Sequence, residues 1–342
     1  MTRMRILVLM HPDFMPPASI EGLSEPEYAP FKTEFDVVAT LRDMGHEVIP
    51  LGVTNDLGVI ERAVREHKPH IAFNLLEELA GVGVFDSHVV AYLESIRLPY
   101  TGCNPRGLML AHNKAVSKIL CKHHRVPAPR FHVFPQGQRT VRRPPRLGFP
   151  LIVKSLTEEG SIGIAEASVV DNDEKLEQRV RFIHEKVGTD AIAEQYLEGR
   201  ELYIGVLGNL RLTTLPVWEM HWPNLRPGAP KIATTKVKWD LAYQKKIGLE
   251  TRPAEDLPDE LENLLVRYSK RVYKALQLSG YARLDFRLTE EGKPYLLEAN
   301  PNPQLAYGED FAESAHAAGM DYEPLLRRIL SLGQRYRLVG QA

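Results

Sequence analysis

Short apolar runs and amphipathic segments alternate along the first 75 residues. The apolar runs are of the length and kind that form strands buried on both faces of a sheet. The amphipathic segments carry apolar residues at helical spacing, and Gly45 is a natural end for the first of them. In chain order, the strand-like and helix-like segments cover 5–10, 34–44, 47–51, 57–68 and 70–75. This alternation predicts an α/β fold that begins with an open parallel sheet.

A segment rich in proline and glutamate, residues 12–30, interrupts this alternation after the first strand. It is expected to form a long loop or a short helical excursion. Ligands of open α/β sheets bind beyond the carboxyl ends of the strands. The segment is therefore expected to lie where it can touch a substrate.

Composition limits the classes of partner. The chain has 342 residues, enough for two or three domains, and a formal net charge of -1, which argues against nucleic acid as a partner. Its two cysteines, Cys103 and Cys121, exclude a disulfide framework and a CxxC metal pair. The apolar run 6–10 is too short for a signal peptide, and no stretch approaches the roughly 20 apolar residues that span a bilayer. We expect a soluble, cytoplasmic protein that does not bind membranes.

The most informative motif is a predicted hairpin formed by residues 281–288 and 294–298. Asp285 lies in the first apolar strand and Glu298 near the end of the second, so the two carboxylates can share one face. Asn300 and Arg283 fall on that face by the period of two. Two carboxylates and an amide oxygen suit Mg²⁺, and a guanidinium beside a metal-bound phosphate stabilises negative charge. A surface hairpin with scattered charges is the alternative interpretation, but buried acidic residues are costly unless they are paired or metal-bound.

Three further features suit a nucleotide. Lys154 ends a buried strand and needs a polar partner, for which a phosphate is a natural candidate. The turn 157–164 contains glycines, and its backbone N–H groups could cradle phosphates before the chain enters another strand. The segment 194–197 ends a strand and could bind an adenine edge, and Glu201 could accept from ribose hydroxyls. Each feature alone is equally compatible with a salt-bridged lysine or an ordinary turn.

These motifs occur in the order found in ATP-grasp enzymes, and in detail the chain resembles the D-alanine–D-alanine ligase family. The resemblance is carried by residues 98–118, 149–164, 193–208 and 281–303, with weaker similarity over 4–10 and 32–38.

The resemblance implies an ADP-forming ligase that joins a carboxylate to an amine through an acyl phosphate. It implies ATP and two Mg²⁺ ions, for which Mn²⁺ can substitute, and it suggests a homodimer. The domains implied are an N-terminal pre-ATP-grasp domain at 1–107, a central subdomain with the phosphate-side lysine at 108–195, and a C-terminal subdomain with the metal site and a lid at 196–342.

Site roles also follow from the resemblance. The implied catalytic residues are Arg283, which would stabilise the acyl phosphate, Lys238 on the lid at 223–258, and Glu34, which would bind the amino group of the first amino acid. The implied metal ligands are Asp285, Glu298 and Asn300. The implied ATP-binding residues are Lys114, Lys154, Ser161, Glu194, Tyr196, Leu197, Glu201 and Lys236. Lys236 and Lys238 compete for the lid contact with phosphate, and Lys238 is preferred because Lys-Trp resembles the family's Lys-Tyr.

The substrate half departs from the family. Gly160 replaces a serine of the family's glycine loop, Glu77 stands where the family has a histidine, and Gln304 replaces a glycine after the metal asparagine. The serine and leucine that hold the second D-alanine in the family are not evident. Glu77, Glu159 and Glu309 add negative charge, which hints at an amino or guanidino group on a substrate. The sequence therefore predicts a ligase of amino acids or amino-bearing small acids other than a D-alanine pair.

Three alternatives stay open at this stage. The chain could be a true D-alanine–D-alanine ligase with an unusual pocket. It could be a nucleotide-binding regulatory protein on an inactive ATP-grasp fold, although the complete set of metal-site residues argues against decay. Carbonyl chemistry through Cys103 or Cys121 is a third alternative, but neither cysteine has the surroundings of a nucleophile.

Overall fold

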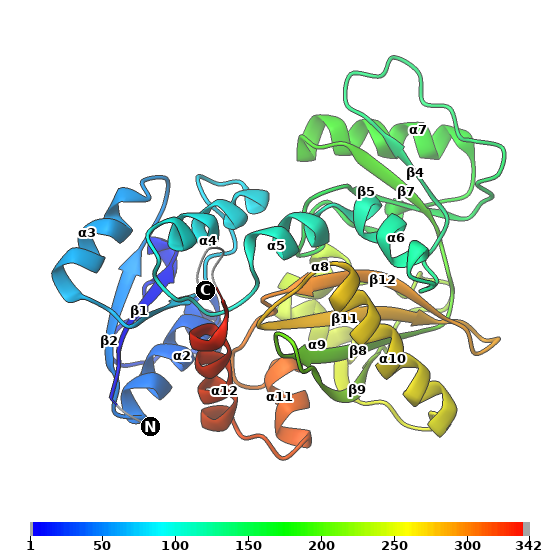
Figure 1. Ribbon diagram of the computed structural model, residues 1–342. Coiled ribbons are helices and arrows are strands. Elements are labelled where there is room, and N and C mark those ends of the chain that lie inside the picture. Colours follow the sequence, from blue (N-terminus) through cyan, green and yellow to red (C-terminus); the bar gives the residue numbers. More distant parts are fainter. Residues whose placement is uncertain (1–2, 338–342) are drawn as a thin grey trace.

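The structure is a computed structural model that describes residues 3–337, and it contains three sheets (Figure 1). In the N-terminal sheet, β1 (Arg5–Met10) lies between β2 (Glu47–Gly52) and β3 (Ile71–Asn74), and both pairings are parallel. The helices that follow the first two strands are α2 (Lys32–Asp43) and α3 (Gly58–His67). The predicted strand–helix alternation is confirmed.

Both faces of this sheet are covered, as the apolar strands predict. The side chains of Leu7 and Leu9 pack with those of α3 and α4 (Asp86–Ser95), whereas Ile6 and Val8 pack with α2 and the last helix. That helix, α12 (Tyr322–Arg335), contacts α2 and β3. The C-terminal subdomain predicted at 196–342 therefore includes a helix, α12, that packs on the N-terminal sheet (Figure 1).

The segment 12–30 forms short helical pieces, namely the 3-10 helix Pro12–Phe14, α1 (Glu25–Tyr28) and the 3-10 helix Ala29–Phe31. Its Glu25 carboxylate lies 3.2 Å from the Lys245 ammonium, on a helix of the predicted lid. The segment thus borders the predicted lid, and its expected contact with a substrate stays a prediction.

The central sheet has the order β4–β7–β5–β6 and is antiparallel. Leucine and valine side chains of α7 (Asp173–Phe182) pack on this sheet. A π-helical turn, Ile183–Val187, continues α7. No strand follows the glycine turn directly, contrary to expectation: a loop and the 3-10 helix Glu166–Ser168 precede a two-residue strand. The strands are β4 (Phe131–Phe134), β5 (Leu151–Ser155), β6 (Val169–Val170) and β7 (Ala191–Gln195).

The C-terminal sheet has the order β10–β9–β8–β11–β12, with antiparallel pairings throughout. The helix α10 (Asp259–Ala275) contacts this sheet, as does α11 (Asp310–Ala317). Sequence analysis did not predict α11 or the strand Thr213–His221. The strands are β8 (Arg200–Leu207), β9 (Thr213–His221), β10 (Glu250–Pro253), β11 (Tyr281–Leu288) and β12 (Pro294–Pro301).

Two linked helices, α5 (Pro105–His112) and α6 (Lys114–His123), connect the N-terminal sheet to the rest of the chain (Figure 1). The lid region contains two short helices, α8 (Thr235–Trp239) and α9 (Leu241–Ile247). Within residues 3–337, no helix is both long and apolar enough to cross a membrane.

Candidate active site

The hairpin of β11 and β12 places the predicted metal ligands on adjacent strands. Asp285 is directly opposite Glu298, and Arg283 is opposite Asn300, in the predicted antiparallel pairing. The Arg283 guanidinium donates to both carboxylate oxygens of Asp285, at 2.9 and 3.0 Å, and the Asn300 amide donates to Asp285 Oδ2 at 2.8 Å. Arg283 also reaches the carboxylate of Asp310, on α11, at 3.3 Å.

The two carboxylates of the hairpin have different electrostatic surroundings. Burial raises the pKa of Asp285 to about 6, since the attraction of Arg283 only partly offsets burial and the charge of Glu298 adds to it. Burial also opposes ionisation of Glu298, but the ammonium groups of Lys114 and Lys154 lead a group of lysines that lowers its pKa to about 2. Glu298 is therefore ionised at neutral pH and faces cations.

The residues of the hairpin fit a magnesium ion. Two carboxylates and an amide oxygen form a small all-oxygen donor set, and Oδ1 of Asp285 keeps a lone pair beyond the one hydrogen bond that it accepts. No group of three or more histidine, cysteine, aspartate or glutamate side chains in the described part of the chain forms a protein-only metal site. This matches Mg²⁺, which is usually held by one or two carboxylates together with phosphate oxygens and water.

One cavity brings together residues that lie far apart in the sequence. Lys114, Lys154, Ser161 and Glu201 line the same cavity as the Asp285 and Glu298 carboxylates. It lies between the central and C-terminal sheets, because its walls come from strands of both.

The glycine loop forms one wall of this cavity. Gly160 and Ser161 have backbone φ angles of +64° and +60°. In residues 3–337, no carbonyl or side chain accepts a hydrogen bond from either of their N–H groups. The Lys114 ammonium donates to the Glu158 carbonyl at 2.6 Å, which fixes the start of the loop. Unpaired N–H groups beside two lysines form a suitable cradle for phosphates.

A buried ion triad supports the phosphate side. The Glu194 carboxylate lies 3.0 Å from the Lys118 ammonium and 2.9 Å from the Lys154 ammonium, and all three side chains are buried. Burial opposes its charge, but the two lysines hold the pKa of Glu194 below its ordinary value. The Glu194 side chain therefore orients two lysines, a role that its predicted contact with adenine did not include.

Some of the groups expected to bind adenine and ribose already have hydrogen-bond partners within the protein. The Tyr196 N–H already donates to the Pro150 carbonyl at 3.0 Å, whereas the Leu197 N–H has no acceptor in residues 3–337. The Glu201 carboxylate accepts from Arg287 at 2.8 Å and from the Tyr203 hydroxyl, also at 2.8 Å. Glu201 is thus held rigidly where it lines the cavity.

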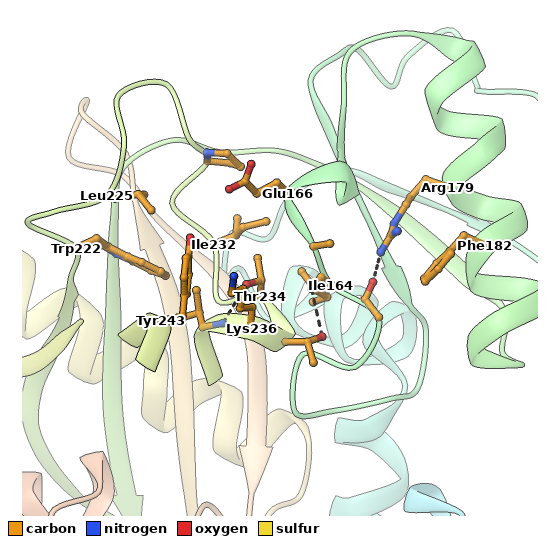
Figure 2. Close-up of a pocket in the computed structure, with 15 residues that line it drawn as sticks. Ile164, Glu166, Arg179, Phe182, Trp222, Leu225, Ile232, Thr234, Lys236 and Tyr243 are labelled. Carbon is orange, nitrogen blue, oxygen red and sulfur yellow. Dashed lines mark hydrogen bonds between the residues drawn. The ribbon is translucent and has the colours of Figure 1, made fainter. Parts of the chain in front are cut away.

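The two candidate lysines of the lid point to different neighbours. Figure 2 shows Lys236 beside Tyr243, and its ammonium lies 4.4 Å from the centre of that ring. Lys238 instead contributes to lowering the pKa of Glu298 and opposes the raised pKa of Glu77. The preference for Lys238 over Lys236 as the phosphate contact stays a prediction.

Lys236 lines a second cavity, of about 510 Å³, between the lid and the helix side of the central sheet (Figure 2). Its larger apolar lining residues are Ile164, Phe182, Trp222, Leu225, Ile232 and Tyr243.

The lid is closed onto the glycine loop. The Trp239 indole N–H donates to the Gly160 carbonyl at 3.1 Å, and the Thr235 hydroxyl donates to the Ser161 carbonyl at 2.6 Å. These bonds use the loop's carbonyls and leave its N–H groups facing the cavity.

The predicted substrate residues come from the N-terminal and C-terminal sheets. Glu34 lies in the first turn of α2 and is 7 % exposed, and Glu77 follows β3 in the cleft, where solvent reaches its side chain. Gln304 is exposed between β12 and α11. The Lys32 ammonium, also on α2, lies 3.9 Å from the carboxylate of Glu309.

Three features of the site escaped sequence analysis. Lys118 lies four residues after Lys114 on one helix, and this spacing was the available signal for a second inward lysine. His112 lies between Asp86 and Glu159, and Asp310 binds Arg283. Nothing local in the sequence indicates either of these long-range contacts.

Glu34 gives the unliganded protein a pH-dependent stability. Burial, with a smaller contribution from Glu77, raises the pKa of Glu34 to about 7 from its ordinary value of 4.5. Between these values the folded state binds more protons than the unfolded state, so the free energy of unfolding should fall as pH rises through this range. We expect Glu34→Gln to flatten this part of the profile in urea denaturation from pH 4 to 8. Identical profiles for the two proteins would contradict the burial of an unpaired carboxylate.

Comparisons with known proteins agree with this geometry. The family model described as "D-ala D-ala ligase C-terminus" matches residues 120–331. The chain is 33% identical over 306 residues to an uncharacterized protein, y4sG, of Sinorhizobium fredii, covering 87% of this chain and 86% of that protein. It is 30% identical over 315 residues to a D-alanine–D-alanine ligase of Desulforudis audaxviator, covering 92% and 96%.

Solved structures share the fold. A D-alanine–D-alanine ligase from Bacillus anthracis complexed with ATP superposes with a TM-score of 0.74 at 24% identity, covering 97% of this chain and 98% of the other. The VanG D-Ala:D-Ser ligase from Enterococcus faecalis gives 0.70 at 18% identity, covering 97% and 99%.

The fold and the site together define an ATP-grasp ligase, with a parallel-sheet N-terminal region and a nucleotide cavity between two antiparallel sheets. The chain belongs to the D-alanine–D-alanine ligase family. It is accordingly an ADP-forming carboxylate–amine ligase that uses ATP and Mg²⁺.

Proposed function

We propose that this ligase joins two amino acids, or an amino acid and an amino-bearing small acid, into a dipeptide-like product, and that its substrates are not a pair of D-alanines. The observation that carries the proposal is a contrast within one site. Six of the residues expected to serve ATP and metal share one cavity, namely Lys114, Lys154, Ser161, Glu201, Asp285 and Glu298. On the predicted substrate side, Glu77 stands where the resemblance implies a histidine. The segment between β12 and α11 ends at Glu309, and α11 begins at Asp310, in a region where the resemblance implies a serine and a leucine that hold the second D-alanine.

In this proposal, the chain's own residues position and stabilise charge. Lys114, Lys154 and the N–H groups of the glycine loop bind the phosphates of ATP, and Lys238 closes over them from the lid. Asp285, Glu298 and Asn300 would hold Mg²⁺, which would neutralise phosphate charge when bound.

The first substrate's carboxylate attacks the γ-phosphorus of ATP, and ADP leaves. The amine of the second substrate then attacks the resulting acyl phosphate, and inorganic phosphate departs as the C–N bond forms. Arg283 stabilises the negative charge that develops on the oxygens of the reacting centre. Its bonds to Asp285 and Asp310 hold the guanidinium in one orientation.

A true D-alanine–D-alanine ligase is the second candidate, since relatives at about a third identity carry that name. It requires an anchor for the carboxylate of the second D-alanine. Near the start of α11, Arg283 is engaged by Asp285 and Asp310, and Lys32 lies 3.9 Å from Glu309. These pairings argue against a free carboxylate anchor at this position.

The test is a product screen with ATP, Mg²⁺ and amino acids of both chiralities, supplied singly and in pairs. We expect ADP and phosphate release that depends on an added pair, with a condensed product detected by mass spectrometry. Full turnover with D-alanine alone, giving D-Ala–D-Ala, would support the second candidate instead. No ADP release across the whole panel would favour an inactive nucleotide-binding protein.

The homodimer that the resemblance suggests and the cytoplasmic location that the sequence composition suggests both stay predictions. Light scattering on the purified full chain checks the first of them.

A further inference from the structure

A buried histidine links the glycine loop to a helix of the N-terminal region. His112 is the last residue of α5, and its Nδ1 lies 2.9 Å from the carboxylate of Glu159, which belongs to the loop. Its Nε2 lies 2.9 Å from Oδ2 of Asp86, the first residue of α4. The three side chains therefore join three separate segments of the chain. His112 and Asp86 are both buried, and a buried polar array of this kind restricts the positions of its members.

Both ring nitrogens of His112 act as donors in this array. Burial disfavours the charged imidazole, but the hydrogen bonds and charges of Asp86 and Glu159 raise the pKa of His112 to about 10. The imidazolium therefore persists at neutral pH and donates to both carboxylates at once. Hydrogen bonds between charged groups are roughly twice as strong as those between neutral groups. The array is accordingly a strong link between α4 and the loop.

The start of the next helix holds the loop at two further points. Lys114, the first residue of α6, donates from its backbone N–H to the Leu156 carbonyl at 3.2 Å. Its ammonium donates to the Glu158 carbonyl at 2.6 Å. Together with the bond between His112 and Glu159, these contacts attach the first half of the loop to the junction of α5 and α6.

The lid holds only the second half of the loop, where its hydrogen bonds reach the Gly160 and Ser161 carbonyls. A lid opens to admit and release ligands, and the loop then keeps only its attachments to the junction of α5 and α6. The N–H groups of Gly160 and Ser161, which find no acceptor within residues 3–337, follow Glu159 directly in the chain. The position of Glu159 therefore sets where these N–H groups lie when ATP binds.

We infer that His112 is a positioning residue of the ligase: together with Asp86 it holds Glu159, and it thereby keeps the N–H groups of the glycine loop in place for the phosphates of ATP. The inference rests on the role proposed for this loop. Glu159 lines the cavity that also contains Lys114 and the metal hairpin, and His112 acts on Glu159 from a buried position.

The test measures the binding of ATP separately from that of amino acids. Glu159→Ala removes the bond to the loop but leaves His112 paired with Asp86, so the fold should be retained. Calorimetric titration of ATP with Mg²⁺, without amino acids, should give a Kd higher by at least roughly tenfold, the factor that one hydrogen bond to a charged group contributes.

Steady-state kinetics with the amino-acid pair that gives the highest wild-type turnover supplies a second measurement. In Glu159→Ala the KM for ATP should rise by a similar factor. The KM for each amino acid, and kcat at saturating ATP, should stay close to the wild-type values, because the loss concerns the binding of one substrate.

Two further variants separate positioning from a general effect on structure. His112→Ala should raise the Kd for ATP as Glu159→Ala does, and the variant with both changes should be no worse than His112→Ala, because both break the same link. His123→Ala, at the exposed end of α6, is the matched control and should bind ATP as the wild type does. Circular dichroism checks that each variant is folded.

The inference and the proposed role of the loop fail in different ways. Wild-type binding of ATP that is unchanged in folded Glu159→Ala overturns the inference alone. Equal rises in the KM for ATP and for the amino acids, or additive losses in the double variant, also overturn it, since they show a general effect on structure. Absence of ATP binding in the wild type itself overturns the role proposed for the loop.

Discussion

Glu298→Gln is expected to lower ATP-dependent turnover by at least roughly a hundredfold while leaving the fold intact, the range seen when one charge-stabilising group is removed from an active site. Glutamine keeps the shape of the side chain but removes the negative charge that faces Lys114, Lys154 and Lys238. It also replaces one of the two carboxylates of the proposed magnesium site. The lysines would then repel one another, and the metal-bound form of ATP would lose a ligand.

The measurement is ADP release with the amino-acid pair that gives the highest wild-type turnover, together with calorimetric titration of ATP in the presence of Mg²⁺. Glu262→Gln makes the same chemical change on an exposed helix and should retain normal values. Near-normal turnover in Glu298→Gln would show that the hairpin does not hold the metal. Unchanged circular dichroism separates loss of chemistry from loss of fold.

Glu194→Gln is expected to reduce the free energy of unfolding by about 3–5 kcal/mol, the usual cost of breaking a buried ion pair. Glu194 is 1 % exposed and lies 3.0 Å from Lys118 and 2.9 Å from Lys154. Without its charge, two buried ammonium groups lose the carboxylate that contacts both of them. The same change should weaken ATP binding, because Lys154 loses the partner that orients it.

Urea denaturation measures this effect. Glu198→Gln, four residues further along the chain, changes an exposed glutamate and should alter stability little. Adding Lys118→Met to Glu194→Gln should recover part of the loss, since it removes one of the two stranded charges. If Glu194→Gln proves as stable as the wild type, the triad does not contribute to folding in the way that its burial indicates.

The site residues that the sequence predicts best are those that lie close together in the chain. The period of two along a strand puts Arg283 and Asp285 on one face, and a short turn brings Glu298 and Asn300 beside them. Local apolar patterns likewise predict the N-terminal sheet to within a few residues at each end. The helices of the lid were harder to predict from the sequence, because they are short and have little periodicity. They depend on tertiary contacts such as the Trp239–Gly160 hydrogen bond.

The sequence by itself therefore determined the class of fold and which residues meet on the β11–β12 hairpin, since both arise from local periodicity and near-neighbour pairing. Only the tertiary structure decided which distant charges meet. Glu194 pairs with Lys118 and Lys154, His112 bridges Asp86 and Glu159, and no basic side chain within residues 3–337 forms an ion pair with buried Glu34. Electrostatic interactions depend on distance and burial, and neither can be read from separation along the chain.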